Sequence, residues 1–231
     1  MQNNLLVLVH CLEAAQRAGV ERLLFLASSC IYPRQASQPM SPAQLMAGAL
    51  EPTSEAFATS RLAGLTLCRA YQRQFGVRFI GGIPADAYGP GDDSSPEDSH
   101  VVAGMLRRMH DAKTAGDEVF RVWGSGNQRR DFLFVDDLAE ACLVALRYHD
   151  GEEPINLSGQ ADVSIRELAE TVRAVVGFEG RLEFDTTRPD GAPRKTLDAS
   201  AISALGFRPR VSLTDGLART YRWFVGSNRL T

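Results

Sequence analysis

The sequence has few cysteines and no long hydrophobic run, and each shortage excludes a class of protein. Its cysteines, Cys11, Cys30, Cys68 and Cys142, are scattered and form no C-x-x-C pair, so we expect free thiols in a reducing, cytoplasmic location. No apolar stretch approaches the ~18 residues of a membrane span. The N-terminal segment also lacks the basic region of a secretory signal, so we expect no membrane partner and no export.

An excess of positive charge is lacking as well. The 25 Lys and Arg residues stand against 28 Asp and Glu residues, which gives a net charge of −3. Nucleic-acid binding along the backbone needs a basic surface, so we expect no nucleic-acid partner. With 231 residues, 44% of them hydrophobic, the chain can bury a sizeable core of its own.

The start of a dinucleotide-binding fold, a strand followed by G-x-G-x-x-G and a helix, is also missing from the sequence. The first strand-like run, 22–27, comes after a helical pattern over 4–18, and no glycine-rich turn follows it. Helical and strand-like segments nevertheless alternate, which indicates an α/β protein. We therefore expect a truncated Rossmann-like parallel sheet with a small C-terminal α/β substrate-binding part.

Periodicity and turn residues predict the remaining elements. The run 22–27 is apolar throughout and reads as a strand buried on both faces. Ser54 is expected to cap the helix that follows it, and Ser164 with Glu167 matches a capping box. We expect helices over 54–75, 99–115, 135–148, 164–176, 198–205 and 213–224, strands over 77–83, 119–122, 154–158 and 181–184, and loops over 28–53, 84–98, 123–131 and 185–197.

Short motifs follow one another along the chain. They are Ser28-Ser29-Cys30-Ile31-Tyr32-Pro33, Glu51-Pro52-Thr53, Ala87-Tyr88-Gly89-Pro90, Asp98-Ser99-His100, Val122-Trp123-Gly124-Ser125-Gly126, Arg130-Asp131-Phe132-Leu133, Val135-Asp136-Asp137 and Pro189-Asp190-Gly191. In this order they resemble the extended short-chain dehydrogenases/reductases, in particular the GDP-L-fucose synthase family, over essentially the whole chain aligned to the family's later two-thirds. The resemblance implies an enzyme that binds a GDP-hexose, epimerises a 4-keto sugar at C3 and C5 and reduces it with NADPH.

Two residues depart from the family pattern. Family members carry a catalytic tyrosine and, four residues later, a lysine, whereas this chain has Phe57 and Arg61. Phenylalanine has no hydroxyl and cannot exchange the proton that accompanies hydride transfer. Because the glycine-rich loop is missing as well, we expect a sugar-nucleotide site without NADP or any other cofactor. A divalent metal is not indicated, although Asp92, Asp93, Glu97 and Asp98 could hold Mg²⁺ beside a diphosphate or simply form a solvated acidic loop.

The resemblance also implies the site residues. Ser28 corresponds to the family's catalytic serine, and Cys30 and His100 correspond to its epimerising acid and base; both side-chain types exchange protons near neutral pH when their surroundings tune them. Arg61, Arg108, Trp123, Arg130 and Asp190 are the predicted substrate-binding residues. Arginine pairs with phosphate, tryptophan offers a flat face, and a carboxylate accepts from ribose hydroxyls.

These expectations give residues 1–90, with 131–158 contributing, a residual Rossmann-like role, and 91–231 mainly a GDP-sugar-binding role. The leading functional hypothesis is a cofactor-independent GDP-hexose isomerase. Within that class we favour a pyranose–furanose mutase for a sugar of the GDP-L-galactose or GDP-L-fucose type, related to the cofactor-free GDP-L-galactose mutase. The alternatives are a GDP-4-keto-6-deoxyhexose 3,5-epimerase and a non-catalytic GDP-sugar-binding subunit. We expect a homodimer formed through the helices over 54–75 and 99–115.

Overall fold

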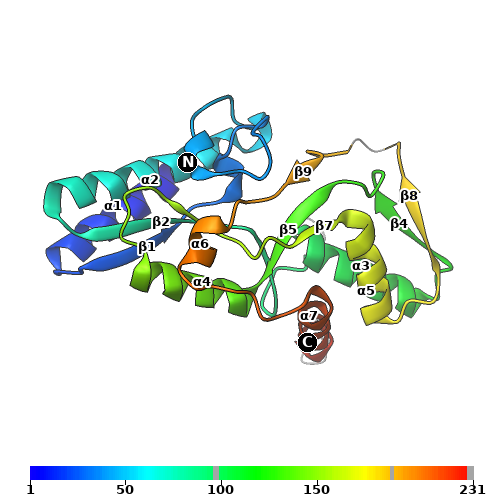
Figure 1. The fold of residues 1–231 in the computed structure, drawn as a ribbon. Helices are drawn as coiled ribbons and strands as arrows, with labels where there is room; N and C mark the ends of the chain where they lie inside the picture. The colour runs from blue at the N-terminus through cyan, green and yellow to red at the C-terminus, as the bar shows by residue number, and fades with distance from the viewer. Residues whose placement is uncertain (96–98, 188–189, 228–231) are drawn as a thin grey trace. The chain divides into compact units, whose positions relative to one another are not determined.

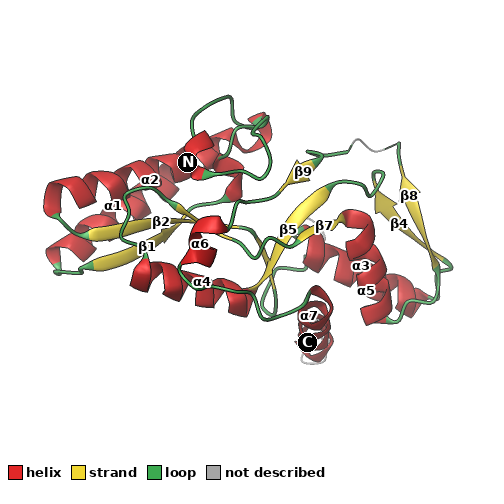
Figure 2. Cartoon of the chain, in the orientation of Figure 1, coloured by secondary structure: helices red, strands yellow, loops and turns green. Residues whose placement is uncertain are grey.

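The computed structural model describes residues 1–95, 99–187 and 190–227, which belong to two compact units (Figure 1). The first unit comprises Met1–Ala85, Leu138–Gln160 and Thr196–Arg208, and the second comprises Asp86–Asp137, Ala161–Lys195 and Pro209–Thr231. Both units combine helices with parallel strand pairs, so the predicted α/β class is confirmed (Figure 2). In the described part of the chain, no helix is long and apolar enough to cross a lipid bilayer.

A parallel three-stranded sheet forms the centre of the first unit. Its strands are β1 (Arg22–Leu26), β2 (Arg78–Pro84) and β6 (Ile155–Leu157), in the order β1-β2-β6. The middle strand β2 is the buried one, whereas β1 at one end of the sheet is only half-buried and its Leu26 is exposed. The prediction that 22–27 is buried on both faces is therefore wrong, because an apolar run alone does not show whether a strand lies in the middle or at the end of a sheet.

Two helices pack together beside this sheet. The helices are α1 (Gln2–Arg17) and α2 (Glu55–Phe75), and α2 packs on β2 (Figure 1). Gly81 of β2 lets Leu65 of α2 approach the strand closely, because a Cβ at this position would collide with the leucine side chain. The helix begins after Ser54 as predicted, but the Ser54 side chain makes no capping hydrogen bond.

The rest of the first unit surrounds this sheet with short elements. The segment 28–53 was predicted to be a loop, and it contains two 3-10 turns, η1 (Ser29–Ile31) and η2 (Pro42–Gln44); a third, η3 (Pro52–Ser54), leads into α2. Most of helix α4 (Val135–Tyr148) belongs to this unit, and α6 (Ser200–Ala204) contacts β6. Asn156 of β6 forms hydrogen bonds with Tyr32, Met40 and Asp198 and so connects β6 to the segments that contain them.

The second unit contains two small sheets and three longer helices. One sheet has the order β3-β5-β7, formed by β3 (Asp86–Tyr88), β5 (Arg129–Phe134) and β7 (Asp162–Ser164), with β9 (Arg194–Lys195) also pairing with β5. The other pairs β4 (Val119–Trp123) with β8 (Arg181–Asp185) in parallel. The helices α3 (Val101–Ala115), α5 (Ile165–Val176) and α7 (Leu213–Ser227) pack in sequence, α3 on α5 and α5 on α7.

The largest core of the second unit joins these elements. Its fully buried side chains include Met105, Met109, Leu168, Val172 and Leu217. Helix α5 begins with the predicted capping box, in which the side chains of Ser164 and Glu167 each bind the other residue's backbone N–H. The local capping pattern therefore placed this helix correctly.

Three predicted loops contain strands that the sequence pattern did not reveal. Strand β3 lies within 84–98, β5 begins within 123–131, and β9 lies within 185–197. Two of these strands have only two or three residues, and β5 begins with the charged run Arg129-Arg130-Asp131. Such segments become strands through pairing with distant segments, which local alternation of side chains does not show.

Candidate functional site

The turn after β1 positions two of the predicted catalytic residues. Ser28 has an extended backbone, and its Oγ accepts a hydrogen bond of 3.4 Å from the backbone N–H of Cys30, which begins the next turn in η1. Both side chains are half-buried. Ligands of open α/β sheets bind outside the carboxyl ends of the strands, and this turn lies at the carboxyl end of β1.

Helix α2 presents the two residues that depart from the family pattern. The guanidinium carbon of Arg61 lies 4.9 Å from the ring centre of Phe57 and 5.8 Å from that of Phe25. Phe57 is exposed, with 40% of its surface accessible. The Nε of Arg61 is buried and has no hydrogen-bond partner among the described residues. Since α2 packs against η1, the Ser28 turn and this stack belong to one local assembly.

His100, the predicted base, precedes helix α3 in the second unit. Its side chain is 80% exposed, and Nδ1 lies 3.3 Å from Oδ1 of Asp92. Asp92 is much less exposed, at 18%, and its other oxygen, Oδ2, is buried without a hydrogen-bond partner among the described residues. The carboxylate therefore orients the imidazole ring, a role that the sequence did not predict for Asp92, which was expected to hold Mg²⁺ or to form part of a solvated acidic loop.

Arg108 lies on two aromatic rings. Its guanidinium carbon is 5.0 Å from the ring centre of Trp123 and 5.4 Å from that of Phe120, and partial burial lowers its pKa from the ordinary value. Trp123 is 58% exposed. An open groove of about 840 Å³ runs beside this stack and is lined by Arg108, Phe120 and Arg121, among others. The stack offers a flat face and a held cation, which suits a nucleobase and a phosphate.

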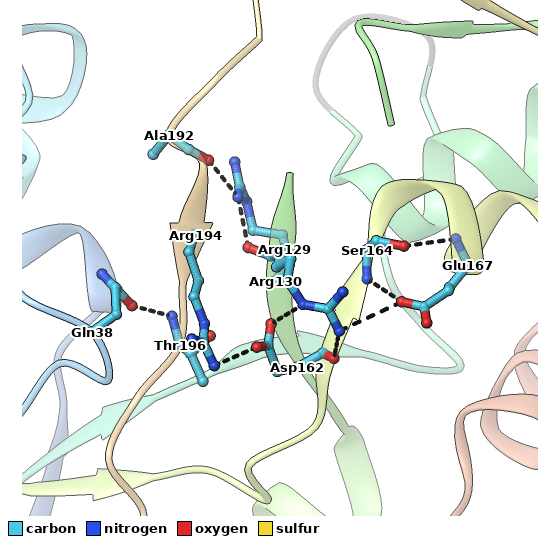
Figure 3. Close-up of polar contacts among 9 residues, drawn as sticks. All are labelled: Gln38, Arg129, Arg130, Asp162, Ser164, Glu167, Ala192, Arg194 and Thr196. Carbon is cyan, nitrogen blue, oxygen red and sulfur yellow. Dashed lines mark hydrogen bonds and ion pairs between the residues drawn. The ribbon is translucent and has the colours of Figure 1, made fainter. Parts of the chain in front are cut away.

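Arg130 lies at the start of β5 within a dense polar network (Figure 3). Its Nη1 donates hydrogen bonds of 2.8 Å to the backbone oxygens of Arg129 and Ala192. Burial lowers its pKa, and the carboxylate of Asp86 opposes that effect. Its Nη1 is bound to neutral carbonyl oxygens, which do not neutralise the positive charge, so the guanidinium can still attract an anion.

The neighbouring Arg129 is used differently. It forms an ion pair of 3.0 Å with Asp162 and reaches Glu167 at 3.6 Å, while Arg194 pairs with the other oxygen of Asp162 at 2.5 Å (Figure 3). These bonds join β5, β7 and β9 around one carboxylate. Arg129 therefore stabilises the strand that carries Arg130, so the two neighbouring arginines have different roles.

Asp190 closes a tight turn in the structure. Its carboxylate accepts hydrogen bonds of 2.8 Å from the backbone N–H and from the hydroxyl of Ser125, and it also accepts from the side chain of Gln128. The two bonds from Ser125, the backbone one first, lower the pKa of Asp190. The predicted contact with ribose hydroxyls stays a prediction, and in the structure the carboxylate orders the segment that follows Trp123.

No cluster of three or more histidine, cysteine or acidic side chains that could hold a metal ion occurs among the described residues. Asp92 contacts His100, while Asp93 accepts a hydrogen bond from the backbone N–H of Ser95. The other two acidic residues proposed for Mg²⁺, Glu97 and Asp98, lie outside the described residues.

The predicted site residues fall into two groups. Ser28, Cys30 and Arg61 belong to the first unit, while His100, Arg108, Trp123, Arg130 and Asp190 belong to the second. Sequence reasoning missed the aromatic supports Phe25 and Phe120, which lie on strands and carry no motif. It also missed the pairing of Asp92 with His100, for which the eight intervening residues give no local signal.

Comparison with known proteins identifies the class of this fold and site. Residues 1–158 match the profile of the NAD dependent epimerase/dehydratase family, and the chain belongs to that family. It is 48% identical over 222 residues to GDP-L-fucose synthase 1 of Arabidopsis thaliana, which covers 96% of this chain and 69% of the relative. It is 42% identical over 231 residues to GDP-L-fucose synthase of Escherichia coli strain K12, covering 96% of this chain and 72% of the relative.

A solved structure agrees with these relatives. The crystal structure of a GDP-L-fucose synthetase from Naegleria fowleri bound to NADP has a TM-score of 0.91 and 26% sequence identity, over 98% of this chain and 73% of that one. The Rossmann-like fold and the resemblance to GDP-L-fucose synthases are thereby confirmed.

Three expectations are corrected by the same comparisons. The cofactor-independent mutase is contradicted, because the relatives with high identity are GDP-L-fucose synthases, which are redox enzymes. The expected absence of NADP is contradicted by the same relatives and by the NADP-bound structure. The suggestion of a truncated form has no support. The first two rested on Phe57, Arg61 and a missing glycine-rich loop, and the third on the missing loop and strand. These departures from a pattern carry less weight than similarity along 96% of the chain.

Proposed function

We propose that this chain acts in the NADPH-dependent epimerisation and reduction of a GDP-4-keto-6-deoxyhexose, the reaction of a GDP-L-fucose synthase. The observation that carries the proposal is the 48% identity over 96% of the chain to a protein of that name. The motif residues Ser28, Cys30, His100, Arg108 and Trp123 are all present in the order that the family requires.

The nucleotide part of the substrate would be held by the second unit. Trp123 gives an exposed face for the base, and Arg108 holds a charge against it for a phosphate oxygen. Arg130 adds a second guanidinium that is not consumed by the ion pairs of its neighbour Arg129. Two arginines suit a diphosphate, because each can form paired, charge-assisted hydrogen bonds with it.

By the family resemblance, Cys30 is the proposed proton-transfer residue of the first unit and His100 that of the second. A carbon beside a ketone releases its proton when a base removes it and a donor stabilises the charge that develops on the ketone oxygen. The hydroxyl of Ser28 can act as that donor, because its oxygen accepts from the N–H of Cys30 and its own proton remains to be given. Asp92 would keep the His100 ring oriented for its part in the exchange.

One residue offers a contact for an oxygen-rich cofactor such as NADPH. The buried Nε of Arg61 is a donor without an acceptor among the described residues, and a ribose hydroxyl or phosphate oxygen would supply one. NADPH, when bound, supplies the hydride for C4 of the sugar. This chain's own residues would then orient the sugar and protonate the oxygen at C4.

The direct test is to incubate the chain with NADPH and GDP-4-keto-6-deoxyhexose while following absorbance at the nicotinamide band and the sugar by NMR. We expect NADPH to be consumed and new C3 and C5 configurations to appear. A second arm compares Arg108→Met with Arg181→Met, an exposed arginine on β8, by calorimetry with GDP. Loss of a charged hydrogen bond to phosphate costs about 1.5–3 kcal/mol, or about 10–100-fold in Kd.

Equal Kd values for the two variants would contradict the phosphate role of Arg108. A chain that binds GDP yet consumes no NADPH and alters no sugar signal would contradict the proposed reaction. We also propose that the working form is a homodimer in the cytoplasm, the location suggested by four free thiols. A monomer at micromolar concentration in sedimentation would contradict the dimer.

A further inference from the structure

The stack of Phe25, Arg61 and Phe57 in the first unit contains a positive charge, on Arg61, but no side chain that can donate a proton to a substrate oxygen as a general acid. The guanidinium of Arg61 lies over two rings, and none of the ion pairs found among the described residues involves it. Arginine stays protonated throughout the physiological range, so it stabilises negative charge without giving up a proton.

Phe57 occupies the exposed face of this stack and offers only carbon and hydrogen. Ser60 lies one turn further along the same helix, and its buried hydroxyl donates to the backbone oxygen of Phe57 at 2.6 Å. That hydroxyl is therefore committed to the helix itself. In the turn that packs on α2, Ser28 keeps a proton to donate, and a serine hydroxyl is a much weaker acid than a phenol beside a guanidinium.

The two half-reactions of the proposed function make different demands on this stack. Exchange of protons beside the ketone needs a base, an acid and stabilisation of a developing negative charge, which Arg61 and Ser28 provide. Reduction forms a C–H bond at C4 from a hydride, moves the π electron pair of the ketone onto oxygen, and needs a proton for that oxygen. NADPH is oxidised and the ketone becomes an alcohol.

We infer that Phe57 separates the two half-reactions, so that this chain exchanges protons at C3 and C5 faster than it reduces C4. The inference rests on the proposed function, in which Phe57 makes the reduction at C4 the slow step. A tyrosine at position 57 would place a phenol beside the Arg61 guanidinium, which lowers the pKa of a phenol and so makes it a better proton donor. Position 57 therefore controls how much epimerised ketone leaves before it is reduced.

The test measures two rates on the same protein with the same substrate. Deuterium incorporation at C3 and C5 in heavy water, without NADPH, gives the exchange rate, and NADPH oxidation gives the reduction rate. We expect the wild-type exchange rate to exceed its reduction rate by at least 10-fold. Phe57→Tyr should raise the ratio of reduction to exchange by about 10²-fold, within the range of a well-placed general acid.

The matched control is Phe75→Tyr, which makes the same chemical change near the far end of α2, where Phe75 is 44% exposed. Its ratio should remain that of the wild type. Arg61→Met combined with Phe57→Tyr should remove most of the gain and shift its basic pH limb upward, because the phenol loses the cation beside it. Circular dichroism and a thermal melt on each variant show that a changed ratio comes from a folded protein.

Three outcomes would overturn the inference. One is a wild-type reduction rate equal to or above its exchange rate, and another is a Phe57→Tyr ratio no higher than that of Phe75→Tyr. The third is a chain that neither exchanges deuterium nor oxidises NADPH, which contradicts the proposed function itself and is thereby distinguished from the first two.

Discussion

At the scale of single residues, Asn156 shows how one side chain can hold three distant segments. It is 1% exposed; its Oδ1 accepts from Tyr32 Oη at 2.6 Å, and its Nδ2 donates to the backbone oxygens of Met40 at 2.9 Å and Asp198 at 3.0 Å. The amide oxygen and both N–H groups of the Asn156 side chain therefore have hydrogen-bond partners. Burial raises the pKa of Tyr32, so the phenol remains a donor to the amide at all ordinary pH values.

Asn156→Ala should lower the free energy of unfolding by about 3 kcal/mol, because it leaves a buried hydroxyl and two carbonyl groups without their partner. Tyr32→Phe removes only one of these bonds and should cost about 1–2 kcal/mol. Urea denaturation followed by circular dichroism gives both values. A loss for Asn156→Ala that is no larger than the loss for Tyr32→Phe would mean that the amide is not the common centre of these bonds.

The lowered pKa of Asp190 predicts how the stability of its bonds to Ser125 depends on pH. The hydrogen bonds from Ser125 hold its pKa below the ordinary value of 3.8, so the bonded turn is fully stabilised above that value. This contribution is lost as the pH falls through the lowered pKa of the folded state. Ser125→Ala removes the hydroxyl but keeps the backbone N–H, so the Asp190 pKa should move part of the way back.

Carbon-detected NMR titration of the Asp190 carboxyl measures this shift. An Asp190 titration unchanged by Ser125→Ala would show that the hydroxyl bond does not form in solution.

At the scale of the element, α2 depends on a glycine where it meets β1 and α1. A Cβ at Gly64 would collide with the ring of Phe25 and would lie 2.8 Å from Leu8 Cδ2. Phe25 is also the inner ring beneath Arg61, so it has little freedom to move away. Forcing an extra methyl group into a packed contact typically costs 1–3 kcal/mol, whereas replacing a helical glycine by alanine gains about 1 kcal/mol.

Gly64→Ala should therefore destabilise the protein by about 1–2 kcal/mol in spite of its better helix propensity. Gly226→Ala in α7 is the matched control, because no described residue lies within 4 Å of the added Cβ there and its backbone is helical. That variant should be neutral or more stable by up to about 1 kcal/mol. Thermal melts of the two variants compare them directly, and equal changes in Tm would contradict the close packing at Gly64.

The elements also show where sequence reasoning succeeds. The helices α2, α4 and α5 follow from apolar periodicity and, for α5, from a capping box formed by Ser164 and Glu167, because these signals are local. Strands β3, β7 and β9 are two or three residues long and exist through their pairing with β5, which no local pattern encodes. In the site, motif residues were found directly, but their supports Phe25, Phe120 and Asp92 emerge only once distant segments are brought together.

At the scale of the whole chain, neither unit is a continuous piece of sequence. The chain passes from one unit to the other at 85–86, 137–138, 160–161, 195–196 and 208–209. The later segments of the first unit pair with its N-terminal segment through backbone hydrogen bonds. Strand β6 pairs with Gly82, Ile83 and Pro84 of β2, and Asp198 and Thr196 exchange backbone hydrogen bonds with Met40.

A fragment of residues 1–85 should therefore fail to fold, although it contains α1, α2, β1 and β2 together with Ser28, Cys30 and Arg61. Without β6 it exposes the buried side chains of Ile80 and Ile83 and leaves one edge of β2 unpaired, and without Asn156 the phenol of Tyr32 loses its acceptor. Far-ultraviolet circular dichroism during urea titration should show a cooperative transition for the full chain and a gradual loss of signal for the fragment. A cooperative transition in the fragment would mean that residues 1–85 fold without β6 and Asn156, so that the later segments of the first unit are not needed for its stability.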